Sequence, residues 1–266
     1  MVARAESHDG TRLRFYPRLR EGVVVSRPNR FVMMVRTGGR TYRCHCPTTG
    51  RIGDLKVEGL RCLLSRGTGK GRKTAYTVEA VSPGASAGRG GDWIGINQTA
   101  ANRYVHHFLA NGQLSSMASG EVCREVRIGH SRIDFKVGDS LLEIKTPLIT
   151  LDSRGGPTVG HSKFDSFDRL IRHFSELSAY VGGGRRALIA LCYLYDAPPF
   201  RRPPRDSSNS KIADAAEEAA EKGVESWQIN MKIDESGVSL LDVFRLDQEA
   251  PDAGPPREGP ARRHSH

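Results

Sequence analysis

One stretch near the middle of the chain, residues 131–145 with the sequence SRIDFKVGDSLLEIK, constrains the fold more than any other. Apolar and charged residues alternate along its first half, which is the period of a half-buried strand. Gly138-Asp139 then supplies a two-residue turn, and the second half alternates again. The stretch therefore predicts a β-hairpin.

The turn fixes the register of the two arms, so that Ile133 pairs with Ile144 and Asp134 lies directly opposite Glu143. Like charges at that separation, about 5 Å, repel each other, whereas a hard divalent cation binds converging carboxylate oxygens. Lys145 projects from the same face and is able to orient or deprotonate a water beside such a cation. These residues therefore predict a metal-assisted hydrolytic site.

A second interpretation of the same residues is a solvated face. Arg132, Lys136 and Lys145 would then neutralise Asp134 and Glu143 without further function. The pattern D…E-x-K also arises by chance in many sequences, so the charges alone favour this second interpretation, and the context on either side of the hairpin must decide.

The composition is that of a globular protein, with 38% hydrophobic and 26% charged residues among 266. No stretch approaches the roughly 20 apolar residues that span a membrane. The N-terminus has no apolar signal region, and five cysteines lack paired spacing. These features predict a cytoplasmic protein with reduced thiols and no membrane partner.

Positive charge is concentrated in the N-terminal third. Residues 1–90 hold 18 Lys and Arg against 6 Asp and Glu, while the remainder holds 22 against 24. A basic module of this kind suits a polyanion such as nucleic acid. Solubility, or a genome rich in arginine codons, is the alternative explanation.

Residues 1–20 show little periodicity and are expected to form a loose basic arm. Residues 21–82 contain short strand-like runs separated by turn residues, which predict an OB-like β-barrel. The runs are Val23–Val25, Phe31–Arg36, Thr41–His45, Arg61–Leu64 and Tyr76–Ala80. The loop from Ser65 to Lys73 is basic but does not match a phosphate-binding Walker loop. Residues 83–92 are expected to be a linker or surface loop.

Residues 93–247 change to a mixed α and β pattern. A helix over 100–110, a strand over 122–128, the hairpin, a helix over 163–180 and a buried strand over 187–195 follow in order. That α-βββ-α-β order is the core of restriction-endonuclease-like domains, whose D…(E/D)-x-K motif lies on the second and third strands. A helix over 212–222 and strands over 226–233 and 238–244 complete this α+β or α/β domain. Residues 248–266 are expected to be disordered.

The chain resembles the sugar fermentation stimulation protein A family over roughly residues 20–247. The motifs that carry this resemblance are His45-Cys46-Pro47-Thr48-Thr49-Gly50, Gly95-Ile96-Asn97, Asn102-Arg103, Ser131-Arg132-Ile133-Asp134-Phe135 and Glu143-Ile144-Lys145. The resemblance implies an N-terminal OB-like domain, a C-terminal nuclease-like domain, DNA binding without marked sequence preference and a regulatory role in sugar utilisation. The chain departs from the family pattern at Thr48, His106, His107, Thr146, Phe167 and Leu170.

The leading hypothesis is a DNA-binding protein with a Mg²⁺- or Mn²⁺-dependent nuclease site. Asp134, Glu143 and Lys145 are the expected catalytic residues, and Asp134, Glu143 and the Ile144 carbonyl are the expected metal ligands. The residues expected to contact nucleic acid are Arg30, Arg66, Lys70, Arg72, Lys73, Arg132, Arg169 and His173. The expected partner is single- or double-stranded DNA, and a homodimer is an open alternative for the assembly.

Two other hypotheses remain at this point. One is a DNA-binding regulator linked to sugar metabolism that keeps the fold without turnover, and the other is a protein that processes RNA. Arg169 and His173 lie four residues apart on one helix face, and this spacing suits either phosphate contact or an ordinary solvated surface.

Overall fold

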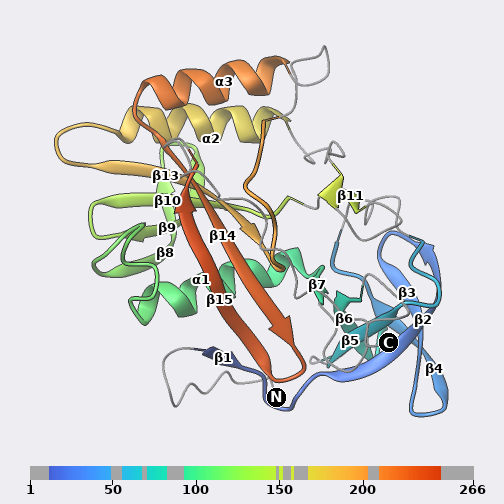
Figure 1. Cartoon of the computed structure of the whole chain (residues 1–266). Helices are drawn as coiled ribbons and strands as arrows, with labels where there is room; N and C mark the ends of the chain where they lie inside the picture. Colours follow the sequence, from blue (N-terminus) through green and yellow to red (C-terminus); the bar gives the residue numbers. More distant parts are fainter. Residues whose placement is uncertain are drawn as a thin grey trace, which may run out of the picture.

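Two sheets organise the chain in a computed structural model (Figure 1). The structure describes residues 12–48, 56–67, 71–82, 93–147, 150–151, 157–158, 167–202 and 210–246. The expected linker over 83–92, the expected tail over 248–266 and Lys70 lie outside these residues. No helix in the described part combines the length and the apolar character needed to cross a bilayer.

The first sheet is the OB-like barrel. Its strands are β2 (Arg20–Asn29), β3 (Val32–Thr37), β4 (Arg40–His45), β5 (Arg61–Arg66), β6 (Tyr76–Val81) and β7 (Ile94–Gly95). They run in the order β4-β3-β2-β5-β6-β7, and a parallel pairing of β4 with β6 closes the barrel. Valine, leucine, isoleucine and methionine side chains fill its interior together with three buried cysteines, Cys44, Cys46 and Cys62. The predicted OB-like barrel is confirmed.

The second sheet has seven strands in the order β1-β15-β14-β13-β10-β9-β8. Their bounds are β1 (Arg12–Arg14), β8 (Val122–Ile128), β9 (Ser131–Val137), β10 (Ser140–Lys145), β13 (Arg186–Tyr193), β14 (Glu225–Asp234) and β15 (Gly237–Arg245). A separate pair consists of β11 (Thr150–Leu151) and β12 (Pro157–Thr158). The pairings of β10 with β13 and of β13 with β14 are parallel.

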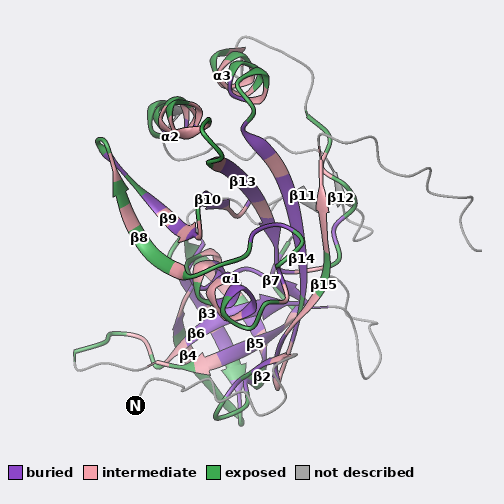
Figure 2. Ribbon diagram, turned by 90° about the vertical axis from the view of Figure 1, so that its left-hand side faces the viewer, coloured by how far each residue is buried: buried purple, intermediate pink, exposed green. Residues whose placement is uncertain are grey.

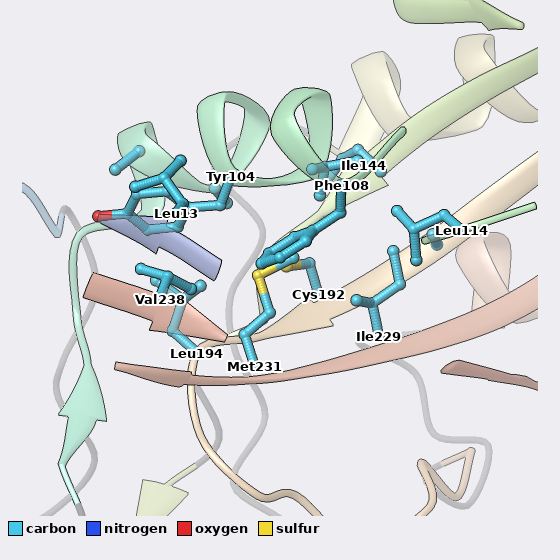
Figure 3. Packing of buried hydrophobic residues seen from close by; sticks show 14 of the residues in the cluster. Leu13, Tyr104, Phe108, Leu114, Ile144, Cys192, Leu194, Ile229, Met231 and Val238 are labelled. Carbon is cyan, nitrogen blue, oxygen red and sulfur yellow. The ribbon is translucent and has the colours of Figure 1, made fainter. Parts of the chain in front are cut away.

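Helices cover both faces of this sheet. On one face lie η1 (Gln98–Ala100) and α1 (Ala101–Ala110), and on the other lie α2 (Phe167–Tyr180) and α3 (Ser210–Glu221). Phe108 of α1 packs over Cys192 and Met231 of the sheet, and Tyr104 of the same helix lies beside Leu13 and Val238 (Figure 3). Because both faces are covered, β10 and β13 are largely buried, while β8 at the edge is exposed (Figure 2). The predicted α-βββ-α-β core is confirmed.

The expectation of a loose basic arm is wrong for residues 12–20. These residues include β1, which pairs antiparallel with β15. Leu13, Phe15 and Leu19 alternate with the arginines and are buried in the core beneath α1. The side chain of Arg12 forms an ion pair with Asp234. The apolar residues of this segment, rather than its arginines, therefore decide its structure.

The strand β7 belongs to the barrel sheet, so the boundary between the two sheets lies after residue 93. Ile94 and Ile96 are buried in the barrel core, and β7 pairs with β6. The backbone N–H of Gly95 donates a hydrogen bond to the carbonyl of Leu194, just after β13, at 2.9 Å. A Cβ atom on Gly95 would lie 2.3 Å from the Cβ atom of Leu194, so only glycine permits this close approach.

Candidate active site

The candidate site lies where the hairpin arms separate. Gly138 in the turn has a φ of +54°, and the ladder pairs Val137 with Ser140 and continues as far as Phe135 with Leu142. The next expected pairs, Asp134 with Glu143 and Ile133 with Ile144, do not form. There the carboxylate of Asp134 accepts the backbone N–H of Ile144 at 2.8 Å, in place of a backbone carbonyl. Beyond Leu142, β10 continues as a partner of β13.

Asp134 sits in an environment that favours its protonated form. Its Oδ2 accepts the N–H of Ile144, and its Oδ1 accepts a hydrogen bond from Asn102 Nδ2 of α1 at 2.6 Å. Burial, followed by the charge of Glu143, raises the pKa of Asp134 to about 6, against the opposing effect of these hydrogen bonds. The two carboxylates therefore interact electrostatically although they are not a cross-strand pair.

Glu143 is 2% exposed and is surrounded by hydrogen-bond donors. Lys145 Nζ donates to its Oε1 at 2.6 Å, and His173 Nδ1 lies 2.7 Å from the same oxygen. The backbone N–H of Asp134 donates to Oε2 at 3.3 Å. Burial alone would raise the pKa of Glu143, but His173 and Lys145 lower it below its usual value. The solvated-face interpretation is therefore wrong for this carboxylate.

His173 is the residue whose role the sequence analysis placed incorrectly. Its spacing from Arg169 predicted that both lie on one outer helix face, but His173 is 2% exposed and reaches Glu143 beneath α2, while Arg169 is exposed. The helical period of α2 did carry a signal, because His173 falls among the apolar residues Leu170, Phe174 and Leu177. His173 belongs to the candidate site and not to a surface that contacts phosphate.

The remaining residues expected to bind nucleic acid lie on several separate surfaces. Arg30 is exposed at the tip of the β2–β3 hairpin, and Arg66 is exposed at the end of β5. Arg72 and Lys73 are exposed before β6, where the guanidinium of Arg72 donates to Thr77. Arg132 is exposed on β9 and forms a 3.3 Å ion pair with Glu125. The structure does not gather these cations around Asp134 and Glu143.

A polar segment between β7 and α1 joins the barrel to the candidate site. Gln98 Nε2 donates to the carbonyl of Thr146 at 2.6 Å, and the hydroxyl of Thr48 donates to Gln98 Oε1 at 3.4 Å. Asn97 Nδ2 donates to the buried carboxylate of Glu79 in β6 at 2.7 Å. The residue after Lys145 is therefore hydrogen-bonded to a segment that contacts both β6 and the residues after β4.

The donor atoms at the site suit a hard divalent cation. Two carboxylates lie near a neutral amide, and because burial and Glu143 raise the pKa of Asp134, a bound cation would favour its ionised form. Among the described residues, no three His, Cys, Asp or Glu side chains are grouped to hold a metal ion by themselves. Mg²⁺ commonly uses one or two carboxylates and completes its shell with water and substrate phosphate. The carboxylates present therefore fit such an ion.

Comparison with known proteins gives consistent matches over both sheets. The profile of the SfsA N-terminal OB domain matches residues 25–96, and that of the sugar fermentation stimulation protein RE domain matches residues 99–237. A sugar fermentation stimulation protein homolog from Pseudoalteromonas atlantica is 31% identical over 237 residues, covering 86% of this chain and 97% of the relative. The homolog from Clostridium perfringens strain SM101 is 27% identical over 235 residues, with 86% and 96% covered.

A solved structure has the same fold. The structure of Pyrococcus furiosus SfsA in complex with Ca²⁺ matches with a TM-score of 0.66 at 22% identity, covering 88% of this chain and 97% of that one. The two profiles span the barrel and most of the second sheet without overlap. This chain therefore belongs to the sugar fermentation stimulation protein (SfsA) family.

Proposed function

We propose that this protein binds DNA with low sequence specificity and hydrolyses phosphodiester bonds at Asp134, Glu143 and Lys145 with Mg²⁺ or Mn²⁺. The observation that carries the proposal is the convergence of two carboxylates and a lysine at one end of a buried strand. Burial and the neighbouring charge of Glu143 raise the pKa of Asp134 and so disfavour its charged form. Such an arrangement is typical of a functional site.

Each residue of the site has a distinct role in this proposal. Asp134, Glu143 and the Ile144 carbonyl would hold the cation, which when bound polarises the phosphate and stabilises the charge that develops on its oxygens. Lys145 is held by Glu143 at 2.6 Å, where its ammonium group positions the attacking water. Asn102 and His173 fix the orientation of the two carboxylates. The Ca²⁺ in the Pyrococcus furiosus complex supports a divalent ion for this fold.

The exposed arginines and lysines would supply sequence-independent contacts to the DNA backbone. Arg30, Arg66, Arg72, Lys73, Arg132 and Arg169 are exposed. Contacts with phosphate position a nucleic acid without reading its sequence, which agrees with low sequence specificity. The OB-domain match supports nucleic-acid binding by the barrel.

A non-catalytic DNA-binding regulator of sugar metabolism is the second candidate function. It is favoured by the hydrogen bonding of the site, because Lys145 and His173 already contact the Glu143 carboxylate and two donors already satisfy Asp134. The name of the family points in the same direction, since it refers to sugar fermentation. Under this hypothesis the protein binds DNA with its site intact and cleaves nothing.

Cleavage assays on purified protein separate the two candidates. Single-stranded, duplex and branched DNA are incubated with Mg²⁺, Mn²⁺ or EDTA, and the variants Glu143→Gln and Lys145→Ala are assayed beside the unmodified chain. We expect metal-dependent cleavage that falls at least about 100-fold in both variants, the lower end for general acid–base groups. Cleavage that survives in both variants, or appears equally in EDTA, would contradict the assigned site.

The chain offers matched controls for this experiment. Glu218 of α3 and Lys222, the residue just after this helix, form a Lys–Glu pair with the same 2.6 Å separation on the exposed surface. Lys222→Ala and Glu218→Gln make the same chemical changes away from the site, and they should leave cleavage unchanged. DNA binding by the unmodified chain without cleavage under any condition would favour the regulator.

A further inference from the structure

The tip of the β2–β3 hairpin presents an aromatic ring beside a cation. Phe31 is 44% exposed, one of few large apolar side chains in the described residues that face solvent to this extent. The guanidinium carbon of Arg30 lies 4.6 Å from the centroid of its ring. Arg27 donates a hydrogen bond to the carbonyl of Arg30 at 3.1 Å and supports the same turn.

The backbone of Phe31 is fixed although its side chain is exposed. Its N–H donates to Asn29 Oδ1 at 2.9 Å, and its carbonyl accepts the N–H of Cys46 at 2.8 Å. The neighbouring residue Val32 pairs with His45 in the β3–β4 ladder. The ring is therefore carried by an ordered turn, which reduces the conformational entropy lost when a ligand binds.

The same tip is linked to the candidate site through the segment that follows β4. Cys46, which binds the Phe31 carbonyl, is two residues before Thr48. Thr48 contacts Gln98, and Gln98 binds the carbonyl of Thr146, the residue after Lys145. A connected set of hydrogen-bonded residues thus leads from the hairpin tip to the site.

An exposed aromatic ring beside a guanidinium group favours single-stranded over double-stranded nucleic acid. A base stacks on an aromatic face only when it is not already paired and stacked within a duplex, and an adjacent arginine contacts phosphate or stacks as well. A duplex would meet Arg30 through its phosphates but would leave Phe31 without a partner. The pair therefore favours single-stranded DNA.

We propose that Phe31 and Arg30 form a single-strand subsite in which Phe31 stacks on an unpaired base and Arg30 contacts the adjoining phosphate. The subsite would bind the same DNA strand on which the Asp134–Glu143 site acts, and in this respect the inference rests on the proposed function. The subsite specifies the substrate class, because cleavage of DNA, or binding of DNA without cleavage, would then require an unpaired segment.

The test measures affinity for a labelled oligothymidine and for a blunt duplex of the same length, in EDTA, with the full chain. Loss of one stacked base corresponds to about a 5- to 150-fold weaker affinity, so Phe31→Ala should weaken single-strand binding by that factor and leave duplex binding nearly unchanged. Phe31→Trp should retain single-strand affinity. Arg30→Ala should reduce the salt slope of single-strand binding by about 0.7.

Tyr16 provides the matched control. It is 77% exposed beside β1, and Tyr16→Ala should leave both affinities unchanged. An unmodified chain that binds DNA while Phe31→Ala has no effect, or an equal effect on both substrates, overturns the subsite and leaves the proposed function standing. An unmodified chain that binds neither DNA overturns both. Tighter binding of an oligouridine with the same dependence on Phe31 would reassign the subsite to RNA.

Discussion

Asp134 is held in the folded chain in surroundings that disfavour its charge. Burial and the nearby Glu143 raise its pKa from 3.8 to about 6. Because the folded state binds the proton more tightly than the unfolded chain, this group contributes stability below about pH 4, and the contribution is lost as the pH rises through about 6. Relative to a neutral side chain, the ionised aspartate lowers the free energy of unfolding near neutral pH by on the order of 3 kcal/mol.

We therefore expect Asp134→Asn to raise the free energy of unfolding at about pH 7.5 in EDTA and to have little effect at about pH 4. The asparagine retains an oxygen for the Ile144 N–H, and the amide of Asn102 can turn to face it. Urea unfolding at the two pH values measures the difference. Destabilisation at both would show that the fold needs this charge.

Asp234 provides a control, because its pKa is shifted in the opposite direction to that of Asp134. Burial raises its pKa, but hydrogen bonds from Arg12 and Ser236 more than offset this and lower it overall. Its stability contribution is therefore present at neutral pH and is lost as the pH falls through its lowered pKa. Asp234→Asn should reduce the free energy of unfolding at about pH 7.5, where Asp134→Asn increases it.

Part of the candidate site could be predicted at the residue scale. The hairpin spacing brought Asp134, Glu143 and Lys145 together, because a two-residue turn leaves few registers open. The roles of Asn102 and His173 could not be predicted in this way, since each reaches the site from a helix distant in sequence. The register error at Asp134 has a related cause: a side chain took the place of a backbone acceptor, and strand alternation does not reveal that exchange.

At the scale of elements, β1 shows how much structure a short segment can carry. Leu13 is 2% exposed and belongs to the core beneath α1, although only three residues form the strand. Leu13→Ala should therefore lower the free energy of unfolding by about 2 to 5 kcal/mol. Tyr16→Ala, a change at an exposed position on the same segment, should stay within about 0.5 kcal/mol.

Chemical denaturation monitored by circular dichroism measures both variants. If both substitutions leave the free energy of unfolding almost unchanged, β1 separates from β15 in solution. The segment would then behave as the loose basic arm that its arginines predicted. A large effect of Leu13→Ala alone would establish β1 as part of the folded core.

The sequence predicted the long elements better than the short ones. Residues 186–193 are nearly all apolar and α2 has a clear helical period, so both were predicted with small errors at their ends. The strands β1 and β7 were not predicted, because a segment of two or three residues is too short to show the alternation of a strand. Their positions are decided by partners far along the chain, β15 for one and β6 for the other.

At the scale of the whole molecule, the barrel and the seven-stranded sheet share part of one core. Leu63 and Ala80 of the barrel pack in the same cluster as α1 and the centre of the sheet. Tyr195, just beyond β13, packs against the barrel interior. Two units joined in this way should lose their structure together, so we expect a single unfolding transition. Trp93 at the junction and Trp227 in β14 report on the two sides.

The contact of Gly95 with Leu194 tests this coupling directly. Gly95→Ala would place a methyl group 2.3 Å from the Leu194 Cβ atom and 3.1 Å from its carbonyl oxygen, which forces the barrel and the sheet apart. We expect a loss of about 1 to 3 kcal/mol, seen as a shift of one shared transition in both tryptophan signals. Leu194→Gly removes the clashing Cβ atom, so the double variant should be more stable than the sum of the two changes predicts, by about 0.5 to 3 kcal/mol. If the changes in the free energy of unfolding of the two single variants simply add, or if the barrel unfolds in a separate transition, the two units fold independently. The hydrogen-bonded segment between the hairpin tip and Lys145 would then have no rigid support.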